Sequence, residues 1–281
     1  MELTRRFLFR GNASALSGQI FRPKTVIVDM EGASSLGVSG GRSRAEIKGR
    51  SFDEVIRFGS AMTLAEGLYD DEKQAKAVTN HKGEPHELNT TTNVVADLRE
   101  LSLGRQIVFN AKRIRAALAS RSPQGSGEPS IVPTKDVLIQ GVDVGGFGLE
   151  IALNAPLFQK YDTRSKVAAA ADDPKVISKF GAHFVLDATI TGQARRAGLV
   201  VRNGIIYTTI VQSIKWAGKP FPGATIDGHV VTVPDFGKIF FGELLVGGSE
   251  RRLTMVRFEL GSEFGGWADG GGVDTNGSFY P

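Results

Sequence analysis

The chain has 281 residues, of which 41% are hydrophobic and 23% charged, and its mean hydropathy is −0.09. This is the composition of a folded globular protein that is long enough to bury a substantial core. The absence of cysteine excludes disulfides and thiolate chemistry, and the net charge of +4, with a pI near 9.3, is too small a surplus to indicate nucleic acid binding.

The N-terminal segment does not read as a secretory signal, because Glu2, Arg5, Arg6 and Arg10 fall inside the stretch that would have to be apolar. No uninterrupted apolar stretch approaches the length that spans a bilayer. We therefore expect a cytoplasmic protein, while release as a particle or surface component stays open.

The first predicted elements are short strands between Arg5 and Phe21, followed by another from Thr25 to Val28 and a Gly/Ser-rich loop. The loop contains the pattern G-x-S-x-G at Gly37–Gly41, in which Ser39 would be the nucleophile of a hydrolase. That role requires a strand–turn–helix setting. No alternation of strands and helices surrounds Ser39, so the pattern favours a surface turn.

Hydrophobic residues recur at helical spacing from Ala61 to Leu68, which predicts a helical insertion near 61–78. The loop that follows groups His81, His86 and Glu87, residue types that bind zinc and other divalent cations. No helical spacing presets these ligands, so the sequence favours a solvated loop over a metal site, and we predict no metal or other cofactor.

A strand is expected from Glu87 to Leu101, and the next segment, 105–120, is ambiguous. Its composition favours a basic amphipathic helix, whereas the neighbouring strands favour a hairpin. We favour a strand because tertiary context often decides short ambiguous segments. The five basic residues between Arg105 and Arg121 lack an aromatic platform, so a solvated face is expected rather than a nucleic acid site.

Three prolines and two glycines make 122–134 the best candidate for a long loop or a domain boundary. We prefer a single β-rich domain over residues 1–281; the alternative is two units, 1–121 and 135–281. A second helical insertion is predicted near 155–180, where Asn154 precedes Pro156 as a helix start.

The stretch from Leu199 to Leu260 carries the clearest β pattern. Asn203 and Gly204 separate two β-branched segments, which predicts a hairpin. Lys238 to Val246 is apolar on both faces, so this strand must be covered by the chain itself or by a neighbouring copy.

Glu243 lies inside this apolar strand, where an unpaired carboxylate would be costly. We predict a structural ion pair with Arg257 or Arg252 of the next strand. Catalysis would need a second acid, and Asp227 and Asp235 are near only in sequence.

The glycine-rich tail spaces out aromatic residues. Together with the apolar strand it indicates an interface of self-association, with candidate residues Phe241, Trp267, Phe279 and Tyr280. Trp216 and Trp267 would instead be stacking platforms if the chain bound a sugar.

These patterns predict a mainly β protein, an antiparallel β-sandwich or flattened barrel with two short helical insertions. The favoured function is a non-enzymatic structural protein that forms a homo-oligomer or larger assembly. One alternative is a β-sandwich module that binds a carbohydrate or small polar ligand, and another is a hydrolase or metal-dependent enzyme. Nucleic acid is not an expected partner.

Overall fold

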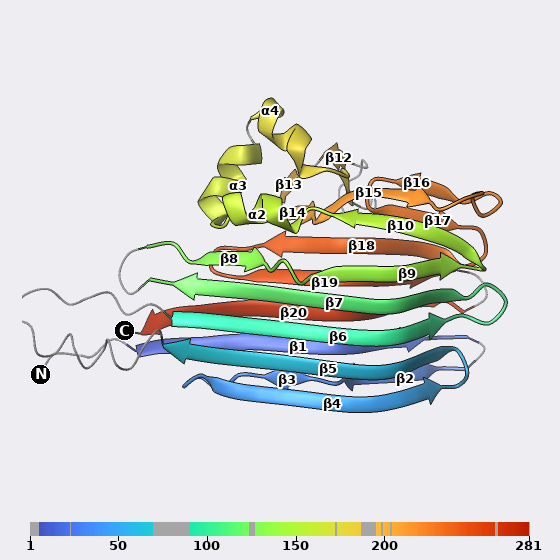
Figure 1. Ribbon diagram of the computed structural model, residues 1–281, viewed down its shortest axis with the longest axis horizontal. Helices are drawn as coiled ribbons and strands as arrows, with labels where there is room; N and C mark the ends of the chain where they lie inside the picture. The colour runs from blue at the N-terminus through green and yellow to red at the C-terminus, as the bar shows by residue number, and fades with distance from the viewer. Residues whose placement is uncertain are drawn as a thin grey trace, which may run out of the picture.

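The computed structural model describes residues 6–22, 24–69, 90–123, 127–171, 173–186, 195–197, 199–202, 204–261 and 264–280. Two antiparallel sheets pack face to face in a sandwich, and a group of short helices lies along one edge (Figure 1). The predicted mainly β class, with an antiparallel sandwich, is therefore confirmed.

One sheet has ten strands and contains both ends of the described chain. Its path runs in the order β13 (Leu199–Arg202), β14 (Ile205–Thr209), β18 (Gly237–Val246), β19 (Arg251–Leu260), β20 (Gly266–Tyr280), β1 (Arg6–Ile20) and β2 (Val26–Glu31). Off this path lie β3 (Ser34–Ser35), which pairs with β1, and the hairpin of β16 (Thr225–Asp227) and β17 (Val230–Val233), which pairs with β18.

The other sheet has eight strands and takes most of the middle of the chain. Its order is β15 (Val211–Trp216), β10 (Phe147–Leu153), β9 (Leu138–Val144), β7 (Phe109–Ser122), β6 (Thr90–Leu103), β5 (Ile56–Tyr69) and β4 (Gly41–Phe52), and β8 (Ser130–Pro133) pairs with β7. Each sheet has one face toward the core, its inner face, and one face away from it, its outer face.

The helical insertion predicted near 155–180 is confirmed. It comprises α2 (Ala155–Lys160), α3 (Arg164–Ala171), α4 (Pro174–Ile177) and the 3-10 turn η1 (Ser178–Phe180). A small separate sheet of β11 (Phe184–Leu186) and β12 (Arg195–Ala197) follows. The buried guanidinium of Arg251 donates to the carbonyls of Tyr161 and Asp162, which ties the insertion to the ten-stranded sheet. None of the helices among the described residues is long and apolar enough to cross a membrane.

The alternation of inward and outward side chains shifts by one residue in the middle of four adjacent strands of the ten-stranded sheet. Gly242, Met255, Gly271 and Ala15 lie side by side at this point, which we call the shift row. Gly242 and Gly271 have positive φ angles of 61° and 68°, a conformation that glycine adopts without steric cost. At the shift row two consecutive residues of each strand face inward, as in a β-bulge repeated across the sheet.

The eight-stranded sheet has a matching shift row. It consists of Gly49, Gly59, Glu100, Lys112 and Gly141. Here two consecutive residues of each strand face outward instead, and the inward residues on either side are three positions apart, as Leu98 and Leu101 are.

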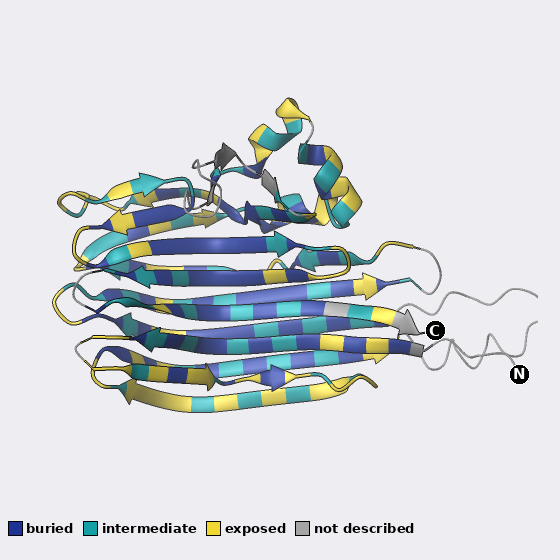
Figure 2. Ribbon diagram, turned by 180° about the vertical axis from the view of Figure 1, so that it is seen from behind, coloured by how far each residue is buried: buried dark blue, intermediate teal, exposed yellow. Residues whose placement is uncertain are grey.

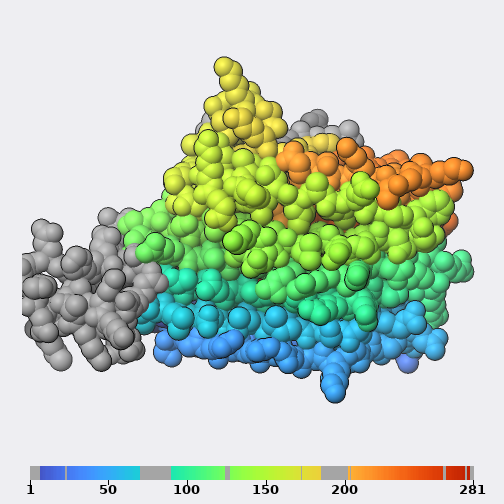
Figure 3. Space-filling model, in the orientation of Figure 1, coloured from blue at the N-terminus to red at the C-terminus, as the bar shows by residue number. Residues whose placement is uncertain are grey.

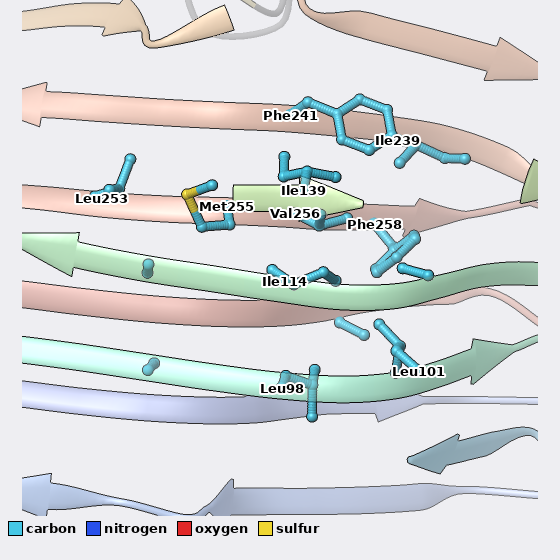
Figure 4. Packing of buried hydrophobic residues seen from close by; sticks show 14 of the residues in the cluster. Leu98, Leu101, Ile114, Ile139, Ile239, Phe241, Leu253, Met255, Val256 and Phe258 are labelled. Atoms are coloured by element: carbon cyan, nitrogen blue, oxygen red, sulfur yellow. The ribbon is translucent and has the colours of Figure 1, made fainter. Parts of the chain in front are cut away.

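The two shift rows lie on opposite sides of the core. Figure 4 labels Met255 of one row, and Leu98, Leu101 and Ile114, which are the inward residues beside the other row. A Cβ atom on Gly271 would lie 3.1 Å from Cγ2 of Ile114, and one on Gly270 would lie 3.5 Å from Cδ2 of Leu98. The extra inward residues of one sheet therefore fill the space that the wider inward spacing of the other sheet leaves. This fit allows close packing although both sheets break their alternation.

Of two predictions about the secondary structure of single segments, one is wrong and one is confirmed. The helix near 61–78 is wrong for residues 61–69, which belong to β5; residues 70–78 lie outside the described part. Residues 61, 63, 65 and 67 face inward there and are all small, and only the sheet gives those positions a shared face. The strand favoured for 105–120 is confirmed from Phe109 onward.

The strand that is apolar on both faces is covered by its own chain. Ile239, Phe241, Leu244 and Val246 enter the core between the sheets. On the outer side, Phe240 lies under the guanidinium of Arg257, whose central carbon is 3.7 Å from the centre of the ring.

Candidate functional site

The outer face of the ten-stranded sheet carries a cavity of about 600 Å³ at the shift row. Outward residues that flank the row are three positions apart, as Ser14 and Ser17 are on β1 and Asp269 and Gly272 are on β20. Three residues of strand span about 10 Å instead of the usual 7 Å, so a hollow opens between the flanking side chains. Gly272 adds no side chain and widens it further.

The walls of the cavity come from strands β1, β19 and β20 and from the segment that links β2 to β3. Met30 of β2, Ala33 of the link and Ser35 of β3 close one side. Ser35 donates to the side-chain oxygen of Asn12 at 2.6 Å, and Asn12 Nδ2 donates to Asp274 Oδ1 at 2.9 Å. These bonds fix one rim of the cavity. Figure 2 shows the outer face of this sheet, and the helical insertion does not cover it.

Asp269 is the most unusual group in the cavity. Its Oδ1 atom is buried and has no hydrogen-bond partner. Burial raises the pKa of this carboxyl to about 6, because the attraction of Arg252 and Arg257 only partly offsets the loss of hydration and Glu243 adds repulsion. The Oγ atom of Ser14, in the same cavity, is likewise buried without a partner.

Buried polar atoms in folded proteins are nearly always hydrogen-bonded, so two exceptions in one cavity call for an explanation. A polar ligand or ordered solvent would supply the missing partners. The cavity offers carboxylate, hydroxyl, amide and guanidinium groups, from Asp269, Ser14, Asn12 and Arg252. This set both donates and accepts hydrogen bonds, and it suits an uncharged ligand with several hydroxyl groups.

The predicted acid in the apolar strand, Glu243, lies next to this cavity on the same outer face. Arg257 donates to both of its carboxylate oxygens, at 2.7 and 2.9 Å, and His229 Nε2 lies 3.5 Å from Oε1. Burial opposes ionisation, but the hydrogen bonds from Arg257 and His229 outweigh it and lower the pKa of Glu243 to about 2. The ring of Phe184 stacks on His229 with a centroid distance of 4.5 Å. This packed group is structural in character.

The sequence also suggested Arg252 as a partner of Glu243, and Asp227 or Asp235 as a second acid. In the described part of the chain, none of these three residues forms a hydrogen bond or ion pair with Glu243. Arg252 lies opposite Leu245 on the next strand and lines the cavity instead. Asp227 Oδ1 lies 2.6 Å from Nε2 of His183, and Asp235 occupies a turn with a φ of 62°. The structure therefore brings together Glu243 and Arg257, but the acid that it adds to this pair is Glu259, which accepts from Arg257 at 2.6 Å, and not Asp227 or Asp235.

The residues named for an enzyme are not assembled into a site. Ser39 is exposed between Gly37 and Gly40, which form an isolated β-bridge, so it occupies a surface turn. The possible metal ligands His81, His86 and Glu87 lie outside the described residues. Within the part of the chain that the structure describes, no group of three or more His, Asp or Glu residues could hold a metal ion.

The four candidate interface residues differ in their exposure to solvent. Phe241 is fully buried in the core, so it is not on the surface of a single chain. Trp267 is 42% exposed on the outer face of β20. The side chains of Phe279 and Tyr280 are outside the described part, although their backbones pair with β1. Trp216 is partly buried against the core.

Sequence reasoning missed Asp269 and Ser14. A signal was present, because Asp269-Gly270-Gly271-Gly272 breaks the alternation of β20 just where a carboxylate precedes three residues without side chains. The partner strand β1 is some 250 positions earlier in the chain, so no local pattern joins the two residues.

A family model described as a domain of unknown function (DUF8256) matches residues 7–247 of the chain. The matched range runs from β1 through β18, and β19 and β20 follow it. No curated protein and no solved structure matches the chain.

Proposed function

The chain belongs to the family described as a domain of unknown function, and from the cavity itself we propose that it is a non-enzymatic binding module for a small polyhydroxylated ligand of the carbohydrate class. The ligand would enter the cavity on the outer face of the ten-stranded sheet. There it would complete the hydrogen bonds of Asp269 and Ser14.

The observation that carries this proposal is the pair of unpartnered polar atoms, Asp269 Oδ1 and Ser14 Oγ, in a single cavity. Leaving a buried donor or acceptor unsatisfied costs about 1–3 kcal/mol, which a ligand hydroxyl would recover on binding. A carboxylate can accept from two neighbouring hydroxyl groups at once, and a sugar presents such pairs.

Trp267 adds a second supporting feature. It stands two residues before Asp269 on β20, on the same outer face, and is 42% exposed. Aromatic rings next to polar pockets favour ligands that have both apolar C–H faces and polar edges. A sugar ring has this character.

An array of purified mono- and oligosaccharides, followed by equilibrium titration with the best hit, tests the proposal. Changing Ser14→Ala and Asp269→Asn together should weaken binding by about tenfold or more, since two hydrogen bonds are lost. The control Glu150→Gln changes an exposed carboxylate on the opposite sheet and should leave affinity unchanged. An array without hits, or equal affinity in the double variant, would refute the proposal.

Self-association is the second candidate, and one observation favours it. Phe21, Ile27 and Trp267 are exposed by 50%, 62% and 42%, and Ile27 and Trp267 pair with the same residue, Gln19, from opposite sides. Such apolar exposure near a sheet edge is typical of contact surfaces. If this corner joins two copies, Ile27→Ser should convert a dimer into a monomer in mass photometry. A wild-type monomer at micromolar concentration would exclude the idea.

A further inference from the structure

The outer face of the eight-stranded sheet carries a second feature that the proposed sugar site does not use. At the shift row of this sheet two consecutive residues face outward, and several of them are basic. They include Lys48 on β4, Arg99 on β6 and both Lys112 and Arg113 on β7. The strands of this face, β4 to β7, are open to solvent (Figure 3).

Asp97 neutralises part of this positive charge through ion pairs. Arg113 donates to its two oxygens at 3.0 and 2.5 Å, and Arg115 donates at 2.8 Å. Arg99 is a third, looser neighbour, with 3.6 Å between Nε and Oδ1. One carboxylate thus stands among three guanidinium groups, and its strongest contacts go to the other two. The charge of Arg99 is left largely uncompensated.

A hollow of about 500 Å³ lies beside this cluster and is lined by Lys48, Ser60 and Arg99, among others. These three residues share one cross-strand row, in which Lys48 pairs with Ser60 and Ser60 pairs with Arg99. The two cations therefore flank the hydroxyl at one strand spacing each, about 4.8 Å. Their long side chains can converge above Ser60.

The other acidic residue at the hollow is already engaged. Glu46 forms an ion pair with Arg44 on the same strand, so this pair adds no net charge. Within the described residues no ion pair involves Lys48, and the side chain of Arg99 is 56% exposed. The hollow therefore has a net positive character, with Lys48 and Arg99 both in its lining.

We infer that this hollow is a binding site for a single tetrahedral oxyanion group, a phosphate or sulfate, held by Lys48 and Arg99 with Ser60 as a hydroxyl donor. Arginine and lysine around an oxyanion form charge-assisted hydrogen bonds, the strongest kind available at a protein surface. Met62 lines the same hollow and offers apolar contact to the remainder of an ester. The inference is independent of the proposed sugar binding.

Calorimetric titration of the whole chain at low ionic strength tests this site with three probes: sodium phosphate, phenyl phosphate, and vesicles that contain phosphatidic acid. We expect at least one probe to bind, with an affinity that falls as salt rises. The three arms separate a free ion, a small ester and a lipid headgroup as sources of the same group.

Two charge-matched variants make the test specific. Lys48→Gln with Arg99→Gln should weaken binding by about tenfold or more, because each lost contact is charge-assisted. Arg57→Gln with Lys215→Gln removes the same charge from exposed positions that do not line the hollow and should leave affinity within about twofold. Equal loss in both variants would mean a diffuse charge effect and would overturn the site, as would the absence of binding by any probe. Retained sugar binding in the first variant shows that the two sites are separate.

Discussion

Two buried or half-buried aspartates, one on each outer face, show what the shift rows do. Asp97 is 3% exposed and is held by Arg113 and Arg115, which keep its pKa below the ordinary value against the opposing effect of burial. Asp269 is held by no hydrogen bond at Oδ1, and burial raises its pKa to about 6. The same shift of one residue pushes side chains together on one face and apart on the other. The result is a hydrogen-bonded charge cluster around Asp97 on one face, and on the other a cavity in which an oxygen of Asp269 has no hydrogen-bond partner.

The largest effect is expected where a buried carboxylate loses its partner. Arg257→Met leaves Glu243 ionised without its two hydrogen bonds, which should lower the free energy of unfolding by about 3–5 kcal/mol. Urea denaturation measures this. Adding Glu243→Met to the same chain should recover most of the loss, since the carboxylate that lost its partner is then removed as well. If the double variant is as unstable as the single one, packing rather than charge is responsible.

The contribution of Asp269 to the stability of the fold should depend on pH. Its pKa is higher in the folded chain than the ordinary 3.8, so the folded state binds the proton more tightly. Its contribution to stability is complete below about pH 4 and is lost as pH rises through 6, by about 3 kcal/mol at 1.36 kcal/mol per pKa unit. Asp269→Asn should therefore gain stability relative to the unmodified chain between pH 4 and pH 7. Parallel stability curves over that range would contradict the assignment.

The shift row itself can be tested at two adjacent glycines. Gly271→Ala places a Cβ on a residue with φ of 68°, 3.1 Å from Ile114 Cγ2, and should cost about 1–3 kcal/mol in thermal or chemical unfolding. Gly272→Ala is the matched control, because its Cβ would meet nothing closer than 3.9 Å, and it should change stability by less than about 0.5 kcal/mol. Similar losses for both would show that the row has no special conformational requirement.

The smallest effect is expected at the shift row of the eight-stranded sheet, where the substitution should stabilise the fold. Glu100 has a φ of 55° although it is not glycine, which costs about 1 kcal/mol. Glu100→Gly should therefore raise the free energy of unfolding by about 1 kcal/mol. Glu66→Gly, at an ordinary position of β5, should lower it by a similar amount. Destabilisation by both changes would mean that Glu100 stabilises the sheet through contacts that outweigh its strain.

The sequence predicted the elements best where one strand carries its own signal. The hairpin predicted between the two β-branched segments and the insertion near 155–180 follow from local turn patterns, and the structure has both, the first as the paired strands β13 and β14. The sequence also predicted an ion pair between adjacent strands, that of Glu243 with Arg257. The helix predicted from Ala61 fails because its apolar spacing combines residues from both faces of β5: Ala61 and Ala65 face inward, whereas Leu68 is exposed.

What the amino-acid sequence determined by itself is therefore the sheet character, the turns and one insertion, because these depend on residues that are neighbours along the chain. The register of β1 against β20 and the opposition of the two shift rows depend on tertiary structure alone. Asp269 acquires its raised pKa and Ser14 its missing partner only when strands from the two ends of the chain lie side by side. The physical reason is that burial and hydration are set by whatever surrounds a group in space, and sequence neighbours supply only a small part of it.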